Sequence, residues 1–137
     1  GLNSGECIRT AGNCNLIINS TYVSLTNCDR CIDARGTSNI TIHGEVICDA
    51  FGDGIRTRGN SDVSIDAGRA NIEICGGVNG IRADGNPTVN LAGNVCTIIG
   101  GENPIRINGN ADVNTEGCVT AIDGCQPVAT PMPSPTP

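Results

Sequence analysis

The chain has 137 residues, enough for a single domain, and it contains one Phe, one Tyr and no Trp, so a core built on aromatic side chains is excluded. All eight cations are Arg, and they stand against 14 acidic residues. The resulting net charge of −6 argues against a nucleic-acid partner.

A five-fold repeat runs along the chain, defined by an isoleucine that is followed four residues later by glycine. These landmark isoleucines are Ile8, Ile32, Ile55, Ile81 and Ile105, and they lie 24, 23, 26 and 24 residues apart. A period of this size is typical of repeats that stack. Each repeat is too short to bury an apolar face alone, so neighbouring repeats must cover one another.

Each repeat contains three short segments with the alternation of a half-buried strand, and the first begins near the landmark isoleucine. The second carries the apolar pairs Leu16/Ile18, Ile40/Ile42, Val63/Ile65, Val89/Leu91 and Val113/Thr115. The third carries Val23/Leu25, Val46/Cys48, Ile72/Ile74, Cys96/Ile98 and Val119/Ala121. We therefore predict an all-β, single-domain fold, a three-sided parallel β-solenoid of about five coils with roughly 24 residues per coil.

One corner of the predicted coil is marked by glycine in every repeat: Gly12, Gly36, Gly59, Gly85 and Gly109. Glycine suits a corner that needs a positive φ. The next residue is Asn13, Asn60, Asn86 or Asn110, with Thr37 in the second repeat. We interpret these asparagines as a ladder of stacked side-chain amides at one turn. The alternative is that Gly-Asn is only a common turn pair.

This pattern resembles the right-handed parallel β-helix of pectate-lyase-like proteins, whose asparagine ladders lie at one turn. The resemblance covers residues 7 to about 123, nearly all of the chain except its tail. It implies the same architecture and a right-handed coil, which agrees with the general preference for right-handed crossovers. It says little about activity, because many functions share one fold.

The resemblance also implies which residues a catalytic site would need, and the sequence does not contain them in that arrangement. Pectate-lyase-like enzymes hold calcium-binding acids beside a catalytic Arg, and hydrolases of this fold group their aspartates. Here Asp62 and Asp112 share a row but Thr88 separates them, which places the carboxylates about 10 Å apart. We therefore expect no catalytic residue, no metal site and no cofactor, and a polysaccharide-degrading enzyme is only the third hypothesis.

Directly after each landmark isoleucine lies an outward residue, which gives the row Arg9, Asp33, Arg56, Arg82 and Arg106. The last three would stack like charges about 5 Å apart, which is unfavourable without anions between them. One interpretation is an interaction row for carboxylates of an acidic polysaccharide or of a neighbouring chain. The other is a solvated face on which the arginines pair with nearby acids such as Asp84.

Nine cysteines in a chain of this length suggest disulfides and an extracellular or cell-surface location, with buried free thiols as the alternative. Equivalent positions suggest Cys7–Cys31 and Cys48–Cys75, with Cys118–Cys125 or Cys96–Cys118 near the C-terminal end and Cys14–Cys28 as a further pair. The odd number leaves at least one thiol unpaired within the chain.

The predicted solenoid domain spans residues 1–125, and residues 126–137 form a Pro/Thr/Ser-rich tail with candidate O-glycosylation at Thr130, Ser134 and Thr136. No amphipathic cap is evident at either end of the repeat. An open coil invites another copy to pair with it. The leading hypothesis is therefore a non-catalytic structural protein that assembles head to tail with copies of itself into a filament. The alternative is a carbohydrate-binding or adhesion module of a larger extracellular protein; neither needs a membrane span.

Overall fold

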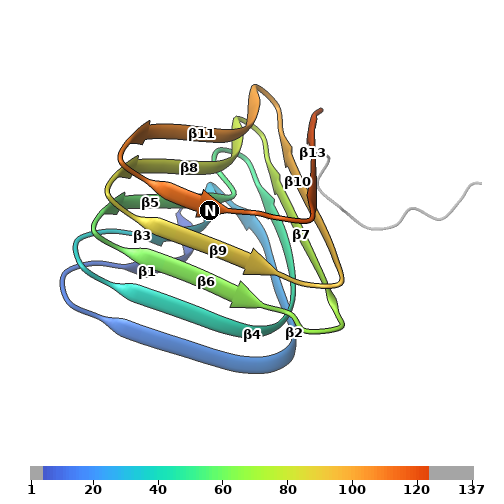
Figure 1. Ribbon diagram of the computed structural model, residues 1–137, viewed down its shortest axis with the longest axis horizontal. Helices are drawn as coiled ribbons and strands as arrows, with labels where there is room; N and C mark the ends of the chain where they lie inside the picture. Colours follow the sequence, from blue (N-terminus) through green and yellow to red (C-terminus); the bar gives the residue numbers. More distant parts are fainter. Residues whose placement is uncertain (1–4, 124–137) are drawn as a thin grey trace, which may run out of the picture.

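The computed structural model describes residues 5–123, and within that range every regular element is a β-strand (Figure 1). The first two coils contain β1 (Glu6–Thr10), β2 (Asn15–Cys28), β3 (Arg30–Ala34) and β4 (Asn39–Ala50). The next two contain β5 (Ile55–Gly59), β6 (Asp62–Asp66), β7 (Asn71–Gly76), β8 (Asn79–Gly85), β9 (Thr88–Ala92) and β10 (Val95–Gly100). The last contains β11 (Asn103–Gly109), β12 (Asp112–Asn114) and β13 (Cys118–Ile122).

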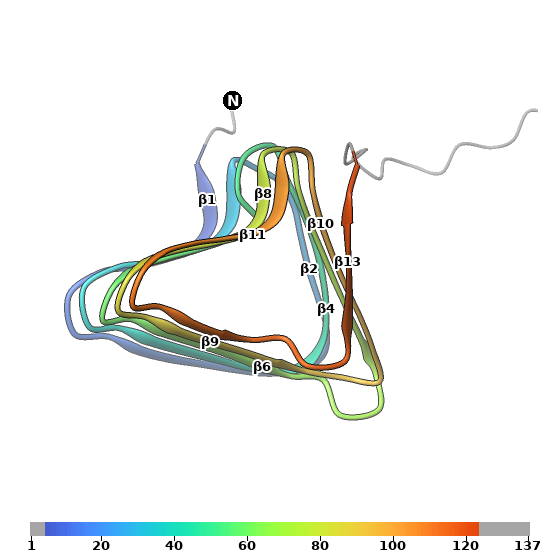
Figure 2. The same ribbon diagram turned by 45° about the horizontal axis from the view of Figure 1, so that its top comes forward.

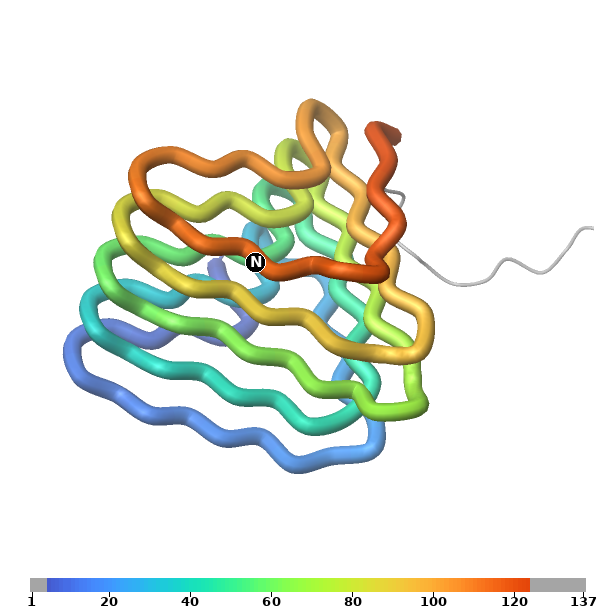
Figure 3. Tube along the Cα trace, viewed as in Figure 1, coloured from blue at the N-terminus to red at the C-terminus, as the bar shows by residue number. Residues whose placement is uncertain are grey.

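The strands form three flat sides around a triangular interior (Figure 2). One side is the parallel sheet β1-β3-β5-β8-β11. The other two sides form one continuous sheet, because the long strands β2 and β4 run across the corner between them. The tube trace in Figure 3 follows about five such coils stacked along one axis. The β-solenoid predicted from the repeat is confirmed.

The landmark isoleucines form a continuous row through the interior. Ile32 pairs in register with Ile8 on one side and Ile55 on the other, and the row continues through Ile81 to Ile105. The three central members are 0% exposed, whereas the first and last are only partly buried. Burying each such side chain favours the folded state by about 1.5–3 kcal/mol, and this burial requires a neighbouring coil on both sides.

The glycine corner has the geometry that the repeat predicts. Gly59 and Gly85 have φ values of 71° and 95°, in the left-handed region that favours glycine. A Cβ on Gly59 would lie 2.9 Å from the carbonyl oxygen of Gly36 in the preceding coil. Glycine is therefore required twice at this corner, for its backbone angle and for the close stacking of successive coils.

Hydrogen bonding at that corner differs from the predicted amide ladder. Asn13, Asn60, Asn86 and Asn110 are all exposed, and the last three donate backbone N–H groups to carbonyls of the coil before. Within residues 5–123 no side-chain amide bond joins these four; Thr37 Oγ1 instead contacts Asn13 Oδ1 and the backbone oxygen of Gly12. The close approach of the glycine backbones satisfies this corner without the amides.

A buried ladder instead lies two residues before the landmark isoleucines. Asn79 is 1% exposed and donates from Nδ2 to Asp53 Oδ1 over 2.9 Å. Asn103 Nδ2 in turn donates to Asn79 Oδ1 over 3.1 Å. The sequence contains a signal for this row, because a polar residue occupies the position in every repeat, but the varied residue types (Glu6, Arg30, Asp53, Asn79, Asn103) hide it.

The third strand of the last coil is shifted by one residue from the predicted alternation. Cys118 and Thr120 pair with Cys96 and Ile98 and continue the inward rows, so the prediction of Val119 and Ala121 as inward residues is wrong. Val119 is 63% exposed. The reason is a shorter path between the register positions: three residues lie between Asn114 and Cys118, whereas five lie between their partners Asn90 and Cys96 in the coil before.

Candidate functional site

Seven of the eight arginines lie on one side of the solenoid, the outer surface of the sheet β1-β3-β5-β8-β11, which we name the arginine face. They are Arg9, Arg30, Arg35, Arg56, Arg58, Arg82 and Arg106. Arg69 is the exception and lies in the exposed turn between β6 and β7. Because the molecule as a whole carries a net charge of −6, this concentration of cations sets the arginine face apart from the rest of the surface.

The predicted row forms in register along this face. Arg9 lies opposite Asp33, Asp33 opposite Arg56, Arg56 opposite Arg82, and Arg82 opposite Arg106. Arg9 and Arg106 are exposed and form no ion pair within residues 5–123. The structure therefore brings the row together, with acids beside only part of it.

Asp33 is the acid of the row, and arginine side chains cover it completely. Its carboxylate lies 2.9 Å from Arg35 Nη2, 3.5 Å from Arg58 Nη2 and 3.7 Å from Arg30 Nη1, and the side chain is 0% exposed. The hydrogen bond and the charge of Asp33 raise the pKa of Arg35. This carboxylate serves to hold the arginines of the second and third coils in place.

Arg56 and Arg82 are less well compensated. They share one carboxylate oxygen, Asp84 Oδ2, at 3.7 Å from Arg56 Nη2 and 3.1 Å from Arg82 Nε. Burial, followed by the charges of Arg58, Arg82 and Arg30, lowers the pKa of Arg56. The Nε atoms of both arginines are buried without a well-oriented hydrogen-bond acceptor. Donors therefore exceed acceptors at the centre of the face.

A surface pocket of about 370 Å³ lies beside this unbalanced pair and is lined by Arg30, Arg56 and Arg82. Its other wall comes from the turns after β4 and β7, which stack at one corner of the solenoid (Figure 2). These turns contribute Phe51, which is 57% exposed, and Val78, which is 37% exposed. We name this hollow the arginine pocket. The sequence repeat predicts its arginine row but not its apolar wall, because the turn residues follow no repeat.

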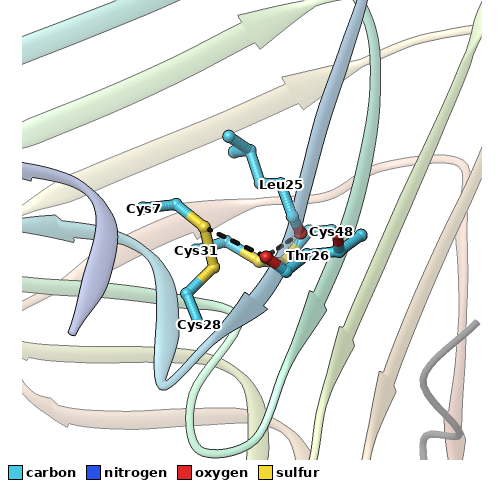
Figure 4. Close-up of a disulfide and its surroundings, with 6 residues drawn as sticks. All are labelled: Cys7, Leu25, Thr26, Cys28, Cys31 and Cys48. Atoms are coloured by element: carbon cyan, nitrogen blue, oxygen red, sulfur yellow. Dashed lines mark hydrogen bonds between the residues drawn. A yellow bond between two sulfur atoms is a disulfide. The ribbon is translucent and has the colours of Figure 1, made fainter. Parts of the chain in front are cut away.

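Two disulfides secure the start of the solenoid (Figure 4). Cys7 bonds to Cys28 and Cys31 bonds to Cys48, with Cα–Cα distances of 5.7 and 6.0 Å. Each bond joins the first strand of a coil to the end of the last strand of that same coil. Cys28 and Cys31 flank Asp29 and Arg30, which both line the pocket.

The predicted pairings Cys7–Cys31, Cys48–Cys75 and Cys14–Cys28 are therefore wrong. Cys7 and Cys31 occupy matching positions of adjacent strands, whereas Cys48 pairs with Ile74 and Cys75 pairs with Asp49. The corner brings the two ends of one coil close enough to bond instead.

At the other end Cys96 bonds to Cys118, its register partner in the next coil, which is one of the two alternatives and excludes Cys118–Cys125. Cys75 is also disulfide-bonded, and Cys14 is an exposed free thiol.

The carboxylates considered for catalysis have structural roles or lie apart. Asp62 Oδ1 accepts the backbone N–H of Thr88 over 3.1 Å, and Thr88 separates Asp62 from Asp112 in the row. Residues 5–123 contain no group of three or more His, Cys, Asp or Glu side chains placed to hold a metal ion. The same range contains no helix that is long and apolar enough to cross a bilayer.

Several predicted features lie outside the described residues. They are Cys125, the tail 126–137 and the candidate O-glycosylation positions Thr130, Ser134 and Thr136. Comparison of the chain with protein-family models, with curated proteins and with solved structures gives no match.

Proposed function

We propose that this protein is an extracellular, non-catalytic β-solenoid that binds acidic carbohydrate through its arginine face. The observation that carries the proposal is the pocket beside the register neighbours Arg56 and Arg82, which share a single carboxylate oxygen, Asp84 Oδ2. Carboxylates or sulfates on a glycan would supply these acceptors, and planar guanidinium groups bind such groups well.

The arrangement of the face suits a polymer that crosses several coils. Arg56, Arg82 and Arg106 are register neighbours, so their backbones lie about 4.8 Å apart along the axis. The disulfides are consistent with an oxidising, extracellular compartment. The resemblance to pectate-lyase-like β-helices agrees with a saccharide ligand, and we include that kinship in the proposal.

Retention on immobilised polyuronate and on a neutral glucan tests this proposal. The native protein should be retained on the acidic polymer alone, and the double variant Arg56→Ala/Arg82→Ala should elute early. Arg69→Ala is the control for the loss of a positive charge, because Arg69 lies in an exposed turn outside the face; each single variant, Arg56→Ala or Arg82→Ala, should reduce retention more than it does. Equal retention of the control and the double variant would contradict the proposal, and shortening of the polymer would point to an enzyme instead.

End-to-end assembly with copies of the same chain is a second candidate, favoured by the exposed interior of the terminal coils. Ile107 belongs to an inward row yet is 47% exposed, and Leu16 and Ile18 of the first coil are only partly buried. A stacked copy would cover these side chains and pair the open strand edges.

Electron microscopy and sedimentation of native protein test assembly directly. Filaments should be lost in Ile107→Asp and kept in Val95→Asp, which changes an exposed residue on the outside of the stack. A native protein that stays monomeric at high concentration would contradict this candidate.

A further inference from the structure

The arginine pocket has the features of a defined binding site in addition to general positive charge. Arg56 is only 15% exposed, and burial, followed by the charges of three other arginines, lowers its pKa. Its ion pair with Asp84 is long, at 3.7 Å, and the same carboxylate oxygen of Asp84 also pairs with Arg82. Buried donors without acceptors are uncommon in folded proteins, and binding of an ion or a polar ligand is one explanation for them.

An apolar wall faces these cations across the pocket. Phe51 and Val78 are both exposed beyond a third of their surface, although they lie on successive turns whose backbones hydrogen-bond to one another. Val78 N–H donates to Gly52 O over 2.9 Å, which fixes the position of both turns. Phe51 is the sole Phe of the chain, and its ring offers a flat apolar surface beside the cations.

Hydrogen-bond acceptors complete the lining. Asp29 and Asp53 both border the pocket, and Asp53 is held by the side chain of Asn79. Carboxylates beside an anion site would repel a bare anion, but they accept hydrogen bonds from hydroxyl groups. The lining therefore combines donors for an anion, acceptors for hydroxyls and an apolar surface.

We propose that the arginine pocket binds one hydroxylated sugar ring that carries an oxyanion, with the oxyanion on Arg56 and Arg82 and the apolar face of the ring on Phe51. The oxyanion is a carboxylate or a sulfate ester, since both present oxygen acceptors to guanidinium groups. A volume of about 370 Å³ is at the small end of ligand pockets, which suits a single ring. The inference rests on the proposed function and makes it specific: one monomer of the glycan is recognised, in one place.

Nuclear magnetic resonance of the full chain tests this with glucuronic acid, N-acetylglucosamine 6-sulfate, inorganic sulfate and glucose as probes. The Nε–H signals of Arg56 and Arg82 should shift with one or both of the acidic sugars, and the stronger response identifies carboxylate or sulfate ester. They should not shift with glucose, and the Arg69 signal should not move with any probe. Shifts with inorganic sulfate that match those with the sugars would mean that an anion alone is bound, and would overturn the proposal.

Two variants separate a defined site from diffuse attraction. Arg82→Lys keeps the charge but loses the planar fork, so affinity for the acidic sugar should fall about tenfold. Phe51→Ala should weaken binding of the acidic sugar by a similar factor and leave the response to inorganic sulfate unchanged. Arg69→Lys is the control for the Arg82→Lys change. If both variants bind the sugar like the native protein while the polymer is still retained, the proposed site is wrong and the proposed function stands. If the native protein binds neither the polymer nor the sugar, the proposed site and the proposed function are both wrong.

Discussion

Asp33 accepts two hydrogen bonds from the guanidinium group of Arg35, at 3.1 Å from Nε and 2.9 Å from Nη2. The carboxylate is fully buried under arginine side chains, so removing its charge leaves these cations without their common partner. We expect Asp33→Asn to lower the free energy of unfolding by about 2 kcal/mol. Urea denaturation measures this; Asp112→Asn, at an exposed position, should change stability by less than about 0.5 kcal/mol.

The stacked glycine corner predicts a difference between two identical substitutions. Gly12 and Gly59 both have φ of 71°, but a Cβ on Gly12 meets nothing within 4 Å, whereas one on Gly59 lies 2.9 Å from Gly36 O. Gly12→Ala should cost about 1 kcal/mol for the backbone angle alone. Gly59→Ala should cost at least about 1 kcal/mol more, because the coils must separate. Equal losses in thermal unfolding would show that the spacing of the coils is not tight.

A buried hydroxyl without a partner predicts a stabilising substitution. Thr57 is 0% exposed, its Oγ1 has no hydrogen-bond partner, and its register neighbours are Ala34 and Ala83. Thr57→Val should raise the free energy of unfolding by about 1 kcal/mol. Thr10→Val in the same row should have the opposite effect, because Thr10 Oγ1 lies 2.8 Å from Ser38 Oγ in a buried hydrogen bond. Loss of stability in both variants would contradict this reasoning.

Asp49 is expected to contribute more to the stability of the folded state at acidic pH than at neutral pH. Burial, and then the charge of Glu73, raise the pKa of Asp49 above its ordinary value of 3.8. The folded state therefore holds this proton more tightly than the unfolded chain. The stabilisation is present below the ordinary value and is lost as pH rises through the raised pKa.

Asp49→Asn removes this component, so the stability of the variant relative to native protein should increase as pH rises from about 4 towards neutrality. Urea denaturation of both proteins across this range gives the difference at each pH. A difference that is independent of pH would contradict the raised pKa.

The disulfide connectivity and the free thiol can be tested by chemical methods. Peptide mapping without reduction should recover the linked pairs Cys7–Cys28, Cys31–Cys48 and Cys96–Cys118. Iodoacetamide should modify Cys14 in the native protein, because its thiol is free and exposed. A peptide linking Cys7 to Cys31 would contradict the closure of individual coils.

The repeat predicted the architecture because stacking forces equivalent residues into rows. The landmark isoleucines and the corner glycines are therefore found where the sequence places them. Features that depend on contacts across corners could not be predicted in this way. Cys7 bonds to Cys28, and Phe51 forms a pocket wall, because turns of different length lie together at one corner. The periodic pattern of the sequence contains no information about these turns.

Closure of the first two coils by disulfides also affects how the chain responds to tension. The bonds Cys7–Cys28 and Cys31–Cys48 enclose sequence separations of 21 and 17 residues, so these segments cannot lengthen when the ends of the chain are pulled. At about 3.4 Å per residue, the two disulfides reduce the length to which the chain can be extended by on the order of 130 Å. The two coils next to the pocket therefore remain closed loops under load, even after the strands around them separate.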